Sequence, residues 1–280
     1  MEVGGLFVSD VDGTLVTPDK RLTDASLAAA KALADARVPF TLVSSRPPRG
    51  MAQVVRAVGV AMPFAAFNGA SLVAPDLSLI EALRLPAEVA ARALALLETR
   101  GIEAFVFARG EWLIRDPAGP KVERERRTVG FDPTVVESFG AVLGDIDKIV
   151  AVSDDPGALD LAEADWRGAF AGRATVERSQ PYYLDLTHAA ANKGEAVARI
   201  ARRLGVPLAR TVVLGDMTND VAMFRVAGFS IAMGQAPDAV KAAAGAVTDS
   251  NTEDGFAKAV RAFVLPRLAP EAAERPAAGA

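Results

Sequence analysis

The sequence predicts an α/β fold, with a Rossmann-like parallel sheet as the core and an α+β domain inserted into it. Short apolar segments alternate with helices at first, short strands then mix with helices, and the first alternation returns at Lys193. Alternating strands and helices are typical of a parallel sheet covered by helices, and the change of pattern indicates an insertion. We expect the core at 1–82 and 188–268, the inserted domain at 83–187 and a disordered tail at 269–280.

The first core segment should contain three strands and two helices. Thr23 can cap the first helix, and Gly59 can end the second. This order of elements builds a parallel sheet, with functional loops at the carboxyl ends of its strands. The expected strands are 6–8, 39–43 and 63–67, and the expected helices are 25–36 and 51–58.

The inserted segment and the second core segment follow from the same periodicities. The charged stretch 122–127 is expected to be a solvated surface. The expected strands of the insertion are 102–107, 112–114, 146–152, 175–178 and 183–186, and its helices are 86–100 and 156–164. The expected strands of the second core segment are 210–214 and 229–233, and its helices are 194–204, one ending at 226, 237–244 and 255–263.

Composition excludes several classes of function. The 35 acidic and 31 basic residues give a net charge of −4 without a basic run, so we expect no nucleic-acid partner, although locally concentrated charge would still suit a small anion. The absence of cysteine excludes disulfides, thiolate zinc sites and cysteine nucleophiles. His188 is the only histidine, and without a Gly-x-Ser-x-Gly turn we expect it to be solvated or capping.

The chain contains no pattern typical of a signal peptide or a membrane span. No basic segment followed by an apolar stretch opens it, and no apolar run reaches about twenty residues. We therefore expect a soluble, cytoplasmic protein without a membrane partner, either a monomer or a small homo-oligomer.

Asp10 and Asp12 directly follow the first apolar strand. Side chains alternate along a strand, so two carboxylates two positions apart would point to one side. Such a pair is costly unless a cation lies between them or one carboxyl acquires a raised pKa and donates a proton. Because Gly13 follows Asp12, an ordinary Asp-Gly hairpin turn is the structural alternative.

Other polar residues are expected at the same sheet edge. Ser44 follows the second strand, Asp216 follows the strand at 210–214, and Lys193 begins a helix. Carboxylate oxygens from Asp10 and Asp216 suit Mg²⁺, whereas a lysine, a hydroxyl and backbone N–H groups suit a phosphoryl group. The combination indicates phosphoryl transfer through an aspartyl-phosphate.

These segments resemble the haloacid dehalogenase superfamily of phosphohydrolases, and more narrowly its Cof-like subfamily IIB with a C2-type cap. The likeness in order and spacing spans about residues 4 to 265. Ser45 departs from the pattern, because the residue after the second-motif hydroxyl is usually Gly; alignment favours Ser44 as the phosphate ligand. The matching segments are DVDGT at 10–14, TLVSSRP at 41–47, FNGA at 67–70, NKG at 192–194 and GDMTND at 215–220.

The resemblance implies a Mg²⁺-dependent phosphatase. Asp10 would attack phosphorus, while Asp12 would protonate the leaving oxygen and later accept a proton from the hydrolytic water. Lys193 would also belong to the catalytic group. The resemblance further implies Mg²⁺ ligands from Asp10, the backbone carbonyl of Asp12 and Asp216; phosphate ligands from Ser44, Lys193 and Asn219; and support from Thr14 and Asp220.

The substrate implied by the resemblance is a small phosphorylated metabolite, such as a sugar phosphate, pyridoxal phosphate or flavin mononucleotide. The inserted domain would close over the core and contact the leaving group of the substrate. Three alternatives stay open: a phosphomutase, a signalling protein that uses a phosphorylated aspartate, and a non-catalytic metabolite-binding protein. Candidate substrate contacts are Ser45, Arg46, Asn68, Gly69, Arg109, Trp112 and Tyr182.

Overall fold

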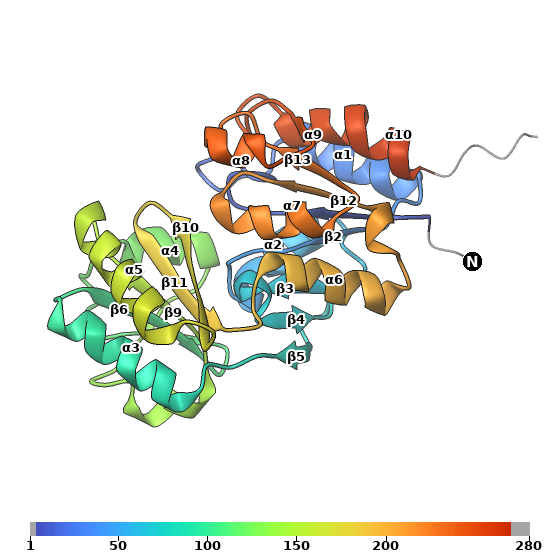
Figure 1. Ribbon diagram of the computed structural model, residues 1–280. Helices are drawn as coiled ribbons and strands as arrows, with labels where there is room; N and C mark the ends of the chain where they lie inside the picture. Colours follow the sequence, from blue (N-terminus) through green and yellow to red (C-terminus); the bar gives the residue numbers. More distant parts are fainter. Residues whose placement is uncertain (1–3, 270–280) are drawn as a thin grey trace, which may run out of the picture.

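The computed structural model describes residues 4–269 and confirms the predicted α/β fold with its additional sheet. Figure 1 shows a larger part that carries both ends of the described chain and a smaller part formed by its middle section. Most of the expected tail at 269–280 lies outside the described residues. In the described part of the chain, no helix is both long and apolar enough to span a membrane.

The larger part is built on a parallel five-stranded sheet in the order β14-β13-β12-β1-β2. Strand β1 is an interior strand and pairs with β12 on one side and β2 on the other. Loops that follow these three strands therefore begin side by side at one edge. The strands are β1 (Leu6–Ser9), β2 (Phe40–Leu42), β12 (Thr211–Gly215), β13 (Phe229–Ala232) and β14 (Ala246–Val247).

Alternation along β1 builds a core on each face of this sheet. Phe7 packs with one buried cluster, whereas Leu6 and Val8 pack with another on the opposite face. The first cluster includes side chains of α1 (Asp24–Asp35), α2 (Pro48–Ala57), α9 (Gly255–Ala259) and the segment Val260–Val264, which leads into α10 (Leu265–Leu268). The second includes those of α6 (Lys193–Leu204), α7 (Val221–Val226) and α8 (Asp238–Ala242).

The third expected strand does not extend the parallel sheet. Strand β3 (Phe64–Ala66) makes one parallel bridge, between Ala65 and Val43, and otherwise pairs antiparallel with β4 (Ser71–Val73). The chain reverses between them because Phe67 and Asn68 have φ values of 50° and 54°. Strand β5 (Leu79–Ala82) completes this three-stranded sheet, which the sequence did not predict.

The smaller part contains a six-stranded sheet in the order β10-β11-β9-β6-β7-β8. Helices α3 (Ala87–Thr99) and α5 (Pro156–Phe170) contribute to the buried cluster on one face. Figure 1 shows this sheet beside the core, joined to it by the chain after β5 and after β11. The strands are β6 (Glu103–Ala108), β7 (Glu111–Ile114), β8 (Thr134–Val135), β9 (Ile146–Val152), β10 (Ala174–Gln180) and β11 (Tyr183–His188).

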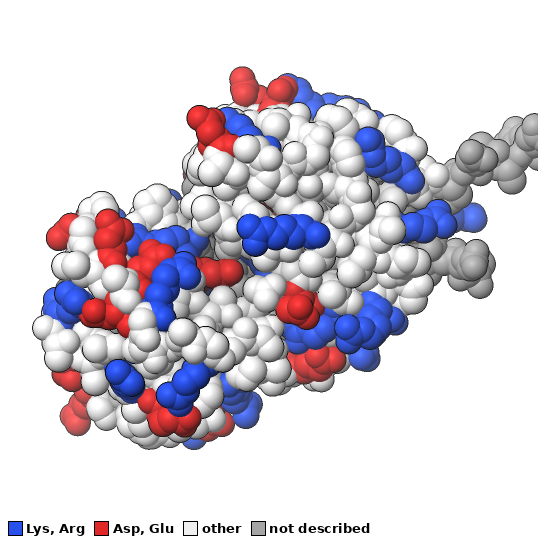
Figure 2. Space-filling view, viewed as in Figure 1, with Lys and Arg blue, Asp and Glu red and all other residues white. Residues whose placement is uncertain are grey.

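Helix α4 (Val122–Val129) differs from the expected solvated surface. Its Val122, Glu125 and Val129 side chains are buried, and the two valines pack in the second cluster of the smaller part. The spacing of these positions places them on one face of a helix, while the charged residues between them face outward. Figure 2 shows acidic and basic side chains intermingled over the visible surface of the smaller part.

The domain boundaries stay a prediction. Strand β5 ends at Ala82, next to the first expected boundary, and β11 continues to His188, one residue beyond the second. His188 accepts a hydrogen bond from the Ala190 N–H at its Nδ1 atom, 3.1 Å away, in the turn after β11.

Candidate active site

The carboxyl edge of the core sheet gathers polar residues from three neighbouring strands. Asp10 follows β1, Ser44 comes shortly after β2, and Asp216 follows β12. The Asp10 N–H donates to the Leu214 carbonyl at 2.9 Å, which fixes the first loop against the strand beside it. Parallel pairing of adjacent strands therefore brings together residues that lie about two hundred positions apart in the chain.

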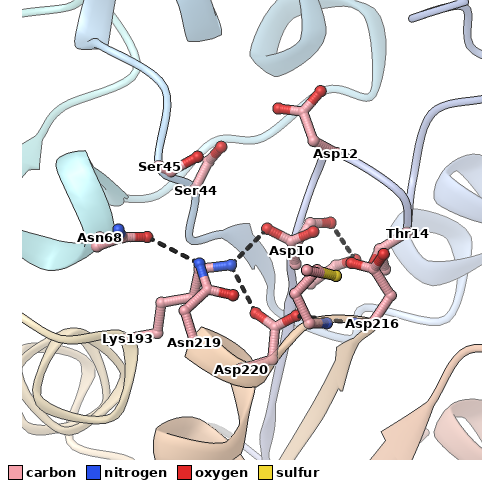
Figure 3. Close-up of polar contacts among 12 residues, drawn as sticks. Asp10, Asp12, Thr14, Ser44, Ser45, Asn68, Lys193, Asp216, Asn219 and Asp220 are labelled. Atoms are coloured by element: carbon pink, nitrogen blue, oxygen red, sulfur yellow. Dashed lines mark hydrogen bonds and ion pairs between the residues drawn. The ribbon is translucent and has the colours of Figure 1, made fainter. Parts of the chain in front are cut away.

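Three carboxylates converge at this edge. Ligand oxygens of Asp10, Asp216 and Asp220 lie within 4.8 Å of one another, and all three residues are buried. The Lys193 Nζ atom donates to Asp10 at 2.7 Å and to Asp220 at 2.5 Å. Figure 3 shows these carboxylates and the amine pointing toward one another. One ammonium cannot balance three carboxylates, so the cluster fits a further cation.

The pKa shifts reflect this imbalance. Burial, together with the neighbouring Asp220, raises the pKa of Asp10 to about 7 despite the opposing charge of Lys193. Burial and the nearby Asp10 raise the pKa of Asp216 well above its usual value. Burial alone would lower the pKa of Lys193, but the two carboxylates raise it above its usual value. A divalent cation would favour the ionised carboxylates, as expected of an oxygen-ligand metal site.

The loops are shaped to hold these side chains. Asp220 accepts hydrogen bonds from the N–H groups of Asp216 and Met217 at 2.7 and 2.9 Å, which closes the turn after β12. Thr14 donates to Asp216 at 3.3 Å. Gly13 has a φ of +87°, and a Cβ atom there would lie 2.2 Å from an Asp216 oxygen, so only glycine allows this approach.

Asp12 is oriented away from the cluster, as Figure 3 shows. Its carboxylate accepts from Arg46 Nε and a second guanidinium nitrogen, both at 2.7 Å, and from Lys20 at 2.6 Å. Burial opposes ionisation, but the two cations hold the pKa of Asp12 well below its usual value. In this arrangement Asp12 is ionised and has no proton to donate.

The smaller part contributes a buried ion pair that the sequence analysis missed. Lys148 of β9 lies 3.0 Å from Asp185 of β11, and their side chains are 6% and 1% exposed. Lys148 also donates to the Ser45 carbonyl at 3.0 Å, and Asn68 donates to Asp185 at 3.1 Å. These contacts join the two parts beside the site. Charged residues within otherwise apolar strand patterns were the only signal.

Amide groups extend this network to the turn after β12. The Asn219 side-chain amide donates to the side-chain oxygen Oδ1 of Asn68 at 3.1 Å. The Asn219 Oδ1 and Asp185 Oδ1 atoms are buried and accept no hydrogen bond from the described residues. Two acceptors next to the acidic cluster are therefore suited to hydroxyl or amino donors of a ligand.

The remaining predicted residues are placed differently. Ser44 is buried and its hydroxyl accepts from the Arg46 N–H at 3.2 Å, while the Gly69 carbonyl accepts from Arg199. Tyr182 lines a small cavity beside Asp12. The structure does not bring the other two candidates to the site, because Trp112 is buried among aromatic side chains and Arg109 pairs with Asp145 on the surface.

The fold and the site define an α/β protein with a buried acidic centre at the carboxyl edge of its parallel sheet, next to a second, smaller sheet. Residues 7–260 match the family model described as haloacid dehalogenase-like hydrolase, and the chain belongs to this family. The family resemblance seen in the sequence is thereby confirmed, together with the enzyme class, phosphoric monoester hydrolase.

Curated relatives of this chain include named phosphatases. The pyridoxal phosphate phosphatase YbhA of Escherichia coli is 24% identical over 91% of this chain and 97% of its own length. The 5-amino-6-(5-phospho-D-ribitylamino)uracil phosphatase YitU of Bacillus subtilis is 25% identical over 92% of this chain and 97% of its own length.

Solved structures share the fold. A haloacid dehalogenase-like hydrolase from Bacteroides thetaiotaomicron superposes with a TM-score of 0.82 at 24% identity, covering 92% of this chain and 98% of its own. A sugar phosphatase of subclass IIB superposes with a TM-score of 0.79, also at 24% identity, over 93% and 99% of the two chains. Both parts of the molecule therefore occur together in related proteins.

Proposed function

We propose that this protein is a Mg²⁺-dependent phosphatase that hydrolyses small phosphomonoesters through an aspartyl-phosphate on Asp10. The observation that carries the proposal is the buried cluster of Asp10, Asp216 and Asp220 around Lys193. A structural role alone does not account for three crowded carboxylates whose charge exceeds that of their one ammonium partner.

The cluster fits a hard divalent cation. Asp10, Asp216 and the backbone carbonyl of Asp12 would hold Mg²⁺, with Asp220 supporting the site through its hydrogen bonds to the loop. When bound, the ion would neutralise charge on the carboxylates and the phosphoryl oxygens.

The chain's own residues would then carry the reaction. The Asp10 carboxylate would attack phosphorus, and Lys193 would balance the charge of the phosphoryl oxygens, together with the Ser44 hydroxyl and Asn219. The leaving oxygen needs a proton, which Asp12 would supply. Because Asp12 is held ionised by Arg46 and Lys20, substrate binding must first break these contacts, so that Asp12 can take up from solvent the proton that it passes to the leaving oxygen. Asp12 would afterwards accept a proton from the hydrolytic water.

The substrate would be a small phosphorylated metabolite, as the names of the relatives suggest. The smaller part, proposed as residues 83–187, would act as a cap over the phosphoryl group. The unpartnered acceptors of Asn219 and Asp185 support a leaving group that carries hydroxyl or amino donors.

A phosphate-release screen tests the proposal. Purified protein is incubated with p-nitrophenyl phosphate and with phosphorylated sugars, vitamins and nucleotides, in Mg²⁺ and in EDTA. We expect Mg²⁺-dependent release that the Asp10→Asn variant lacks. Transfer of phosphate between positions of one substrate would indicate a phosphomutase, and a stable phosphoprotein without turnover would indicate a signalling protein. Release that persists in EDTA would contradict the metal assignment.

A further inference from the structure

A strongly basic groove opens next to the site. It has a volume of about 690 Å³ and lies between the loop before α1, helix α2 and the end of α4. Among the described residues, no acidic side chain lines it, although the whole chain carries a net charge of −4. The basic residues that line it are Lys20, Arg21, Arg46, Arg49, Arg56 and Arg127.

Two of these arginines have no acidic partner within the described chain. Arg21 pairs with Asp19 and Arg127 pairs with Glu123, but no ion pair involves Arg49 or Arg56. The Arg49 guanidinium instead lies over the Phe131 ring, 4.5 Å from its centroid. Their charges are therefore available to an anion in the groove.

The groove adjoins a small cavity beside Asp12 of the candidate active site. Lys20, Arg46 and Thr128 line both the groove and the small cavity beside Asp12. The Arg46 guanidinium reaches Asp12 on one side and the Gly50 carbonyl of α2 on the other, 3.4 Å away. A ligand whose phosphoryl group lies at Asp10 could thus extend past Arg46 into the groove.

We propose that the groove holds a second anionic group of the substrate, so that the preferred substrates are phosphomonoesters that also carry another phosphate or a carboxylate. This inference rests on the proposed phosphatase function. Arg49 and Arg56 lie seven residues apart on one face of α2, about 10 Å along its axis. Either arginine can meet the second group, depending on the length of the substrate. A charge-assisted contact of this kind raises affinity about tenfold.

The test uses a series of α,ω-alkanediols of increasing length, each prepared as monophosphate and as bisphosphate. We expect kcat/KM for the bisphosphate, halved because it has two equivalent ends, to exceed that of the monophosphate by about tenfold at the matching length. The double variant Arg49→Gln/Arg56→Gln should remove this preference at every length, whereas Arg56→Gln should remove it only for substrates long enough to reach Arg56. Both variants should leave p-nitrophenyl phosphate hydrolysis unchanged. Arg202→Gln/Arg203→Gln is the control, because it removes the same charge from exposed positions on α6.

Calorimetry of the same compounds in EDTA measures binding independently of turnover. Tighter binding of the bisphosphate that is lost in Arg49→Gln/Arg56→Gln supports the inference even if no ester is hydrolysed, a result that would overturn only the proposed function. Equal losses for monophosphates and bisphosphates would show that the groove merely attracts anions, and would overturn the inference. Equal affinity of the two series for the wild-type protein would also overturn it.

Discussion

Replacing Lys148 by methionine should destabilise the protein and weaken its activity together. At the observed separation of 3.0 Å, the attraction between Lys148 and Asp185 amounts to about 5 kcal/mol at an effective dielectric constant of about 20. Part of this is offset by desolvation, and loss of one partner of a buried pair typically costs about 3–5 kcal/mol because the other charge stays buried. The Lys148→Met variant should also lose the contact to Ser45 that joins the two parts.

Urea unfolding and kcat/KM measure the two effects. The Asp185→Asn variant and the double variant complete a double-mutant cycle. The sum of the two single losses of unfolding free energy should exceed the loss in the double variant by about 0.5–3 kcal/mol. Arg100→Met is the matched control, because the Arg100–Asp165 pair is about one-third exposed on each side and solvent-exposed ion pairs contribute little to stability. Strictly additive losses, or a Lys148→Met variant as stable as the control, would refute the reasoning.

Two further variants test the charges around the site. Lys193→Met should lower kcat by about 10²–10³ because Lys193 is the ammonium that faces Asp10; a loss under about tenfold, with the fold intact by circular dichroism, would contradict its role. Burial raises the pKa of Glu177, on β10, from 4.5 to about 7. Between these pH values the folded state keeps a proton that the unfolded state loses, so the free energy of unfolding falls as pH rises. Glu177→Gln should therefore be more stable than wild type at pH 8 by up to about 3 kcal/mol and differ little at pH 4, as denaturant titrations at both pH values would show. If Glu177→Gln is more stable than wild type by the same amount at both pH values, ionisation of Glu177 is not the cause.

The sequence predicted elements best where one periodicity decides the structure. The run 146–152, apolar except for Asp147 and Lys148, matches β9 residue for residue. Helix α2 begins at Pro48, earlier than expected, since proline suits the first turn of a helix. Strand β3 follows the expected parallel pairing at one bridge only, and its main pairing with β4 depends on the backbone reversal at Phe67 and Asn68, which apolar periodicity does not show.

The sequence also predicted only part of the candidate site. Asp10 and Asp216 lie together because both follow adjacent parallel strands, a relation that the order of elements implies. The orientation of Asp12 toward Arg46 could not be predicted, because it depends on which neutralising cations lie within reach. Lys148 was missed for a related reason: spacing places a residue on one face of a strand but does not show what that face meets.

Mass spectrometry of the acid-quenched protein tests directly whether Asp10 carries the phosphoryl group during turnover. The protein is mixed with Mg²⁺ and a substrate found by the phosphate-release screen, quenched during turnover and digested. We expect one added phosphoryl group on the peptide that contains Asp10, and its absence in Asp10→Asn. Turnover with the phosphoryl group on another residue, or with no phosphorylated peptide at any quench time, would contradict an aspartyl-phosphate on Asp10.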